Sequence, residues 1–156
     1  MSNVFYLPSA STNQGLAARA AKIAGARELS SEELRRRLLA EDFPAGEVET
    51  EIERMVQIGA LDDEALATRL AEKYSKRYSA RIISQKLAER RIPREIVDAA
   101  VRAVGSDTEI GLIQAQLEKL ARQGKSLADP ASRQKIIQSL QRKGFRQEQI
   151  LRAIEK

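Results

Sequence analysis

The sequence contains no cysteine and no histidine, and these two absences exclude many kinds of functional site. Without cysteine there are no disulfides and no thiolate ligands, and without histidine there are no imidazole ligands, so most zinc, iron and copper sites are excluded. The usual Ser–His and Cys–His nucleophile systems are excluded as well, which leaves carboxylates, lysine and tyrosine for catalysis. We therefore expect no metal and no cofactor.

Long apolar runs are also missing. No segment approaches the roughly 18 apolar residues that a membrane-spanning helix requires. The N-terminus lacks the charged segment followed by an apolar core that marks a signal peptide. These absences favour a cytoplasmic protein without a membrane partner.

The sequence does contain an apolar pattern that occurs three times, with successive gaps of four, five, five and four residues. The three copies are Leu34, Leu38, Phe43, Val48 and Ile52; then Ile83, Leu87, Ile92, Val97 and Val101; then Ile136, Leu140, Phe145, Ile150 and Ile154. A gap of four keeps two side chains on one helix face, whereas two successive gaps of five cannot continue a single stripe. Each copy therefore predicts a helix, a corner that holds a buried Phe or Ile, and a second helix.

Helix-boundary residues support this interpretation. Pro44 and Pro93 follow the corner residues of the first two copies, and Gly144 precedes the corner residue of the third. Ser30 and Glu33 have the spacing of a capping box before the first copy, and Asp129 followed by Pro130 is typical of the helix start before the third.

A further helix is predicted ahead of each copy: one over about residues 14–27, one beginning at residues 62–64, and one from near Ser106 or Asp107. The sequence thus predicts an all-α fold of three tandem three-helix repeats. We expect a flexible N-terminal leader over residues 1–13, repeat 1 over 14–61, repeat 2 over 62–105 and repeat 3 over 106–156.

Charge is distributed unevenly along these repeats. Residues 30–61 carry four basic and eight acidic residues, a net charge of −4, whereas residues 62–105 and 106–156 carry +3 and +4. A basic protein with an acidic segment suits contact with a nucleic acid through one part and with a protein through another. Solvated helix faces are the alternative explanation.

Two groups of residues are candidates for such contacts. On a helix over residues 73–81, Lys73 and Arg77 would share one face and Tyr74 and Tyr78 the neighbouring one. Phosphates could then bind the cations while a ring stacks on a base or seals the edge of the core. The four-residue segments just before the corner residues change in charge, from Glu41 and Asp42 in the first copy to Arg90 and Arg91 in the second and to Arg142 and Lys143 in the third. The candidate cations are Lys73, Lys76, Arg77, Arg81, Arg90, Arg91, Arg94, Arg142, Lys143 and Arg146.

The acidic pairs do not predict an active site. Asp62 with Asp63, and Glu32 with Glu33, stand at predicted helix starts, where capping is the ordinary role of a carboxylate. We expect no catalytic residue and no small-molecule substrate, and hence a protein that is not an enzyme.

Four short motifs resemble the RecX family, whose members modulate the RecA recombinase. The motifs are Arg27, Leu29, Ser30, Glu33 and Leu34; Gly59, Leu61, Asp62, Asp63 and Ala67; Arg81, Ile82, Leu87 and Ile92; and Leu140, Gly144, Phe145 and Ile150. Together they cover about residues 20–156. The chain departs from the family pattern at Leu66, Ser79 and Arg91, where Phe, Gly and Gly are usual.

The resemblance implies an elongated, curved array of three-helix repeats. It also implies a partner, the RecA filament on DNA, and a negative effect on filament growth, strand exchange, ATP hydrolysis and LexA-directed coprotease activity. The resemblance supplies no binding residue to transfer. Two alternatives remain open: a repeat protein that binds single- or double-stranded DNA directly, and a helical scaffold for some other protein.

Overall fold

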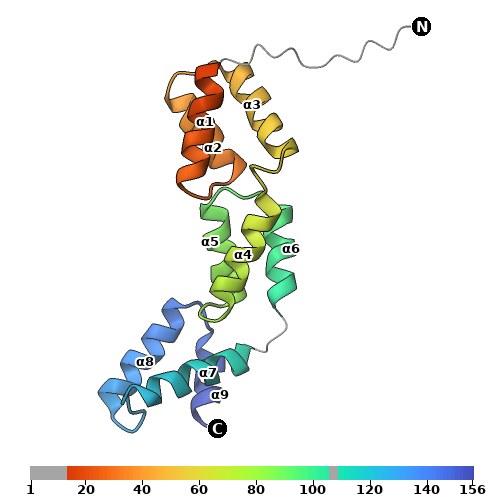
Figure 1. The fold of residues 1–156 in the computed structure, drawn as a ribbon. Coiled ribbons are helices and arrows are strands. Elements are labelled where there is room, and N and C mark those ends of the chain that lie inside the picture. The colour runs from red at the N-terminus through yellow and green to blue at the C-terminus, as the bar shows by residue number, and fades with distance from the viewer. Residues whose placement is uncertain (1–13, 106–108) are drawn as a thin grey trace, which may run out of the picture. The chain divides into compact units, whose positions relative to one another are not determined.

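The computed structural model describes residues 14–105 and 109–156, and all regular structure within them is helical (Figure 1). The helices are α1 (Gln14–Ala26), α2 (Ser31–Ala40), α3 (Ala45–Gln57), α4 (Asp63–Ser75), α5 (Ala80–Glu89), α6 (Arg94–Val104), α7 (Glu109–Arg122), α8 (Pro130–Arg142) and α9 (Gln147–Ile154). They confirm the predicted all-α class. None of these helices is both long and apolar enough to cross a membrane.

Two predictions concern residues outside the described ranges. One is the flexible leader over residues 1–13, and the other is the start of the seventh helix near Ser106 or Asp107.

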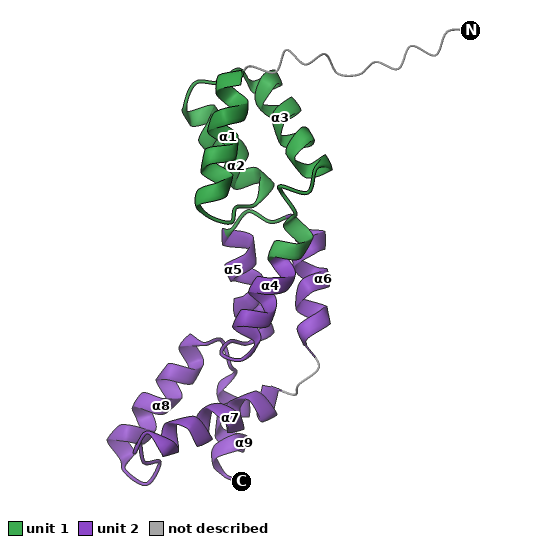
Figure 2. Cartoon of the chain, viewed as in Figure 1, with its two compact units in different colours: residues 1–66, 90–92 green, residues 67–89, 93–156 purple. Residues whose placement is uncertain are grey.

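The chain divides into two compact units (Figure 2). Unit 1 contains the chain up to Leu66 together with the short segment Arg90–Ile92, and unit 2 contains Ala67–Glu89 and Pro93–Lys156. The units do not coincide with the three predicted repeats, although three helices fall in each repeat. The repeat boundaries therefore stay a prediction.

Unit 1 is built around α1, α2 and α3, which pack against one another. Its core consists of Leu16, Ala20, Ile23, Leu29, Leu34, Leu38, Val48, Ile52, Met55 and Leu61. The predicted capping box is present: the Ser30 hydroxyl accepts from the Glu33 backbone N–H, and the Glu33 carboxylate accepts from the Ser30 backbone N–H. This reciprocal pair satisfies two of the backbone donors left open at a helix start.

Unit 2 contains the greater part of α4, together with α5 to α9. Helix α5 packs against α6, while α7 and α8 both pack against α9. Buried residues of the last three helices form a core of Ile113, Ile136, Leu140, Phe145, Ile150 and Ala153. As the sequence predicts, Asp129 caps α8, because its carboxylate accepts from the Ser132 backbone N–H at 2.8 Å.

Burial of the repeated apolar positions confirms the pattern. All of them are buried except Phe43, Val101 and Ile154, which are half-buried. The corner residues Ile92 and Phe145 are only 5% and 3% exposed. The repeated positions therefore serve packing rather than binding.

The three corners share one backbone conformation, which residue type signals clearly only at the third. Asp42, Arg91 and Gly144, which occupy equivalent positions, have φ values of 64°, 54° and 91°. A residue in this left-handed region commonly ends a helix, and glycine adopts it without the steric cost that other residues bear. Only the third corner has glycine, and its surroundings require it. A Cβ at Gly144 would lie 2.2 Å from Ser79 Oγ and 2.3 Å from Ile82 Cγ1.

Candidate functional site

The stretch from Lys73 to Arg81 is not one helix, in contrast to the helical arrangement assumed from the sequence. Helix α4 ends at Ser75, and the next residues form a turn in which the Arg77 and Tyr78 backbone N–H groups both donate to the Tyr74 carbonyl. The turn leaves Lys73, Lys76 and Arg77 exposed. The turn is followed by Ser79, which is buried and directly precedes α5.

Both tyrosines of this stretch are half-buried and in contact. Their ring centroids are 5.9 Å apart with an interplanar angle of 77°, an edge-to-face arrangement. The ammonium group of Lys86, on α5, lies 5.4 Å from the Tyr74 ring centroid and 4.8 Å from that of Tyr78. Lys86 was not among the residues selected from the sequence, because only the packing of α5 beside the end of α4 brings it to these rings.

A buried glutamine connects the same turn to the third corner. The Gln116 side chain is on α7 and is 8% exposed. Its amide nitrogen donates to the Lys76 carbonyl at 2.7 Å, and its amide oxygen accepts from Lys143 Nζ at 2.7 Å. The Ser79 backbone N–H in turn donates to the Lys143 carbonyl at 3.0 Å. These bonds fix the position of Lys143 relative to the turn.

Lys143 lies among other cations. Burial lowers its pKa most, and the charges of Arg77, Lys119 and Lys125 lower it further. Two of these residues, Arg77 and Lys143, were predicted from the sequence, whereas Lys119 and Lys125 were not. Repulsion among like charges makes the site favourable for an anion, because an anion offsets the repulsion.

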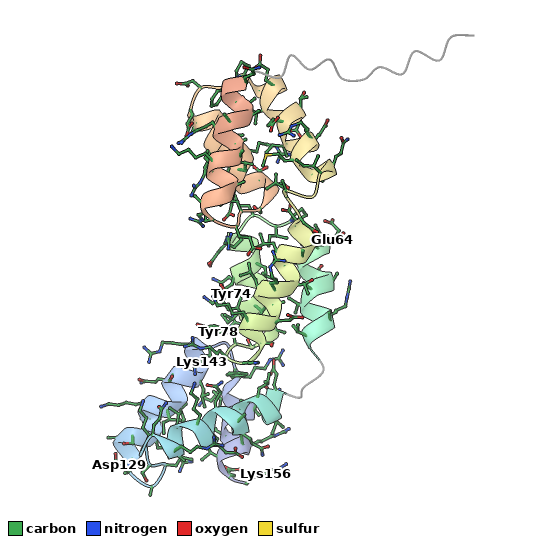
Figure 3. All side chains as sticks on the ribbon, in the orientation of Figure 1. Glu64, Tyr74, Tyr78, Asp129, Lys143 and Lys156 are labelled. Atoms are coloured by element: carbon green, nitrogen blue, oxygen red, sulfur yellow. The ribbon has the colours of Figure 1, made fainter. Side chains whose placement is uncertain are left out.

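A hollow of about 410 Å³ opens between α5 and α8, in the part of unit 2 where Figure 3 labels Tyr78 and Lys143. The residues that line it are Tyr78, Ile82, Gln85, Lys86, Glu89, Ser139, Arg142 and Lys143. Of the two predicted stacking residues, only Tyr78 lines this hollow. The predicted cations Arg142 and Lys143 also line it, so the structure brings together one tyrosine and two cations from separate motifs.

In unit 1, Arg90 takes part in an internal ion pair. Its guanidinium donates to both carboxylate oxygens of Glu33, at 2.7 and 3.0 Å, and to the Glu28 carbonyl at 2.8 Å. The acidic corner residue Glu41 is likewise paired, with Arg19. Two of the corner charges that the sequence offers for contact with a partner, Arg90 and Glu41, are therefore paired within unit 1.

The remaining predicted cations are exposed. Arg81 on α5 and Arg91 in the turn after α5 are exposed, and Arg94 Nε lies 3.7 Å from Asp98 Oδ2. Arg146 is exposed at the N-cap of α9. The structure does not gather these four residues around the hollow.

The paired aspartates have structural roles. Asp62 Oδ1 accepts from the Ala65 backbone N–H at 2.9 Å and so caps α4, as predicted. Asp63 accepts from the Ser31 backbone N–H at 2.8 Å, and so its carboxylate lies at the start of α2 rather than of its own helix. Across residues 14–105 and 109–156 no group of three or more acidic side chains could hold a metal ion.

Comparison with known proteins agrees with this architecture. The family model described as "RecX, third three-helix domain" matches residues 107–154. A regulatory protein RecX of Trichlorobacter lovleyi is 28% identical over 134 residues, which cover 83% of this chain and 87% of that protein. Another, of Pelodictyon phaeoclathratiforme, is 27% identical over 137 residues and covers 86% of this chain and 84% of the relative.

Solved structures show the same fold. The crystal structure of RecX from Lactobacillus salivarius has a TM-score of 0.73 at 18% identity, over 91% of this chain and 94% of that one. A crystal structure of a regulatory protein RecX has a TM-score of 0.71 at 19% identity, over 93% of this chain and 72% of that one. The family model, both relatives and both folds lead to one conclusion: the resemblance of this chain to the RecX family is confirmed.

Proposed function

We propose that this protein is a negative regulator of DNA recombination and repair that binds the RecA–DNA filament in the cytoplasm. Its binding inhibits filament extension, strand exchange, ATP hydrolysis and coprotease activity. The observation that carries this proposal is the similarity to relatives named regulatory protein RecX, which extends over more than four fifths of the chain. The role requires no catalytic residue, in keeping with carboxylates such as Asp62 and Asp63 that cap helices.

The test is ATP turnover by RecA on single-stranded DNA with the purified protein added below one molecule per RecA subunit. We expect turnover to fall and the protein to sediment with the filaments. Electron microscopy of the same samples is expected to show shortened filaments or an occupied groove. Unchanged turnover together with no co-sedimentation would overturn the proposal.

Charge variants test which surface of the protein inhibits RecA. Arg77→Gln with Arg142→Gln removes two exposed cations beside the turn and the hollow, and we expect weaker inhibition. A matched control, Arg102→Gln with Arg133→Gln, removes the same charge from exposed positions of α6 and α8 that do not line the hollow. If both double variants inhibit equally, net charge rather than this surface accounts for the effect.

A second candidate function is direct binding of nucleic acid, favoured by Lys86, Arg142 and Lys143, which line one hollow, and by the charges of Arg77, Lys119 and Lys125, which act on Lys143. Affinity for bare DNA should then fall steeply with salt, because each phosphate that a cation neutralises releases counterions. For single strands the slope of log K against log salt is about −0.7 per neutralised phosphate. A shallow slope that Arg77→Gln leaves unchanged would contradict this function.

A further inference from the structure

We propose that the hollow between α5 and α8 receives one unpaired base of a single-stranded nucleic acid, while the cations that line it bind the neighbouring phosphates. The proposal deepens the second candidate function and rests on it. It specifies that the ligand is single-stranded rather than duplex, and that it binds at one hollow rather than over the whole basic surface.

The chemistry of the hollow suits a base. Tyr78 and Ile82 supply an aromatic and an aliphatic surface, and stacking on an aromatic ring tolerates every base, since every base has a π face. Gln85 and Ser139 add an amide and a hydroxyl, which can donate to or accept from the polar edge of a base. A volume of about 410 Å³ leaves room for one planar ring system.

The charges of the hollow suit phosphates on either side of that base. The Lys86 ammonium lies over the Tyr78 ring, 4.8 Å from its centroid, so a base that stacks on this face displaces it toward a neighbouring phosphate. Arg142 at the end of α8 and Lys143 in the corner that follows also line the hollow. One acidic residue, Glu89, also lines the hollow, where it accepts a hydrogen bond from the Gln85 amide at 3.2 Å. Three cations against one carboxylate leave a net attraction for anions.

Single strands fit this arrangement better than duplex. In a duplex the bases are paired and stacked, so a recessed ring such as Tyr78 cannot reach a base face, whereas an unpaired base can turn into the hollow. An acidic peptide would satisfy the same cations but would bring no ring to the tyrosine. The test therefore includes both competitors.

The experiment measures fluorescence anisotropy of labelled ligands with the full chain in the absence of RecA. The ligands are a short oligothymidylate, an abasic strand of the same length with the same phosphates, and the corresponding duplex. We expect oligothymidylate to bind at least about fivefold more tightly than the abasic strand, the lower end of the effect of one stacked base. Equal affinities would overturn the inference.

Variants test whether the preference for a strand with bases depends on the hollow. Ser139→Leu fills it without changing any charge, and we expect it to abolish the preference for bases; Gln138→Leu, at the exposed neighbouring position outside the hollow, is the matched control. Tyr78→Phe should retain the preference and Tyr78→Ala should lose it. If Ser139→Leu loses helical circular dichroism, Gln85→Trp blocks the same hollow from an exposed position on α5.

Glu89 provides a test in the opposite direction. Because its carboxylate repels phosphates, Glu89→Gln should tighten oligothymidylate binding about two- to fivefold, in line with one screened charge interaction near a surface. A preference for bases that survives Ser139→Leu and Tyr78→Ala, or competition by polyglutamate as strong as by oligothymidylate, would overturn the inference. Binding of no strand at all would overturn direct nucleic-acid binding as well, while leaving RecA regulation to its own assay.

Discussion

At Gly144, adding one carbon should lower the stability of the fold substantially. It has a φ of 91° and lies against Ser79 and Ile82 of unit 2, so that a Cβ would be 2.2 Å from Ser79 Oγ and 2.3 Å from Ile82 Cγ1. Ser79 is fully buried, and its backbone N–H donates to the Lys143 carbonyl next to the glycine. Gly144→Ala should therefore both strain the backbone and separate this corner from the start of α5.

The magnitude has two parts. A non-glycine residue in the left-handed region costs about 1–2 kcal/mol. Forcing an extra carbon into a close-packed site costs about 1–3 kcal/mol more. We expect Gly144→Ala to lower the free energy of unfolding by roughly 2–5 kcal/mol, a large fraction of the total for a small protein.

Gly124→Ala is the matched control. Gly124 also follows a helix with a positive φ, 77°, but a Cβ there would meet nothing within 4 Å. This variant should lose only the stability that the backbone conformation costs, about 1–2 kcal/mol. Urea unfolding of both variants, followed by circular dichroism at constant buffer and temperature, gives the difference. Equal losses would refute the argument from the close approach of Ser79 and Ile82.

Three further predictions concern single residues. Arg91→Gly, at an exposed position with φ 54°, relieves a strain of about 1–2 kcal/mol but adds freedom to the unfolded chain worth about 0.5–1 kcal/mol. It should therefore raise the free energy of unfolding by about 0.5–1 kcal/mol, which urea unfolding checks. Asp129→Ala should lower it by about 1 kcal/mol, because the cap to Ser132 is lost, whereas Asp129→Asn should retain most of the cap. The pKa of Glu33 is lowered: burial alone would raise it, but the hydrogen bonds from Arg90 and the Ser30 N–H outweigh that effect. The stability that Glu33 contributes is therefore complete above its ordinary pKa of 4.5 and is lost as pH falls through the lower folded value. Glu33→Gln should cost about 1 kcal/mol at neutral pH. It should also make the free energy of unfolding depend less on pH in that acid range, which urea unfolding at several pH values measures.

Local signals in the sequence predicted the helices well. The capping box at Ser30, the Asp129 cap and the break at Pro44 and Pro93 all involve residues within four positions of one another, so their geometry depends on the chain nearby. The left-handed corner at Gly144 was also signalled by residue type. At Asp42 the signal is weak, because aspartate adopts that conformation more often than most residues but far less readily than glycine, and at Arg91 there is none.

The candidate site was predicted only in part. Tyr78, Arg142 and Lys143 were selected from separate stretches, but nothing in the sequence placed them around one hollow. Lys86 and Gln116 were missed, since a lysine or a glutamine at a helical position is usually solvent-facing. Their roles come from partners on other helices.

By itself, the sequence determined the helical class, the places where helices end and the apolar positions that are buried, because each depends on periodicity and short-range capping. Only the tertiary structure decided which charges are available for a partner. Arg90 and Lys143 occupy equivalent positions just after α5 and α8, yet Arg90 is bound to Glu33, 57 residues away, whereas Lys143 is held by Gln116 among other cations. The physical reason is that an ion pair or a hydrogen bond forms only where packing brings both groups within about 3 Å, and no local pattern encodes so distant a partner.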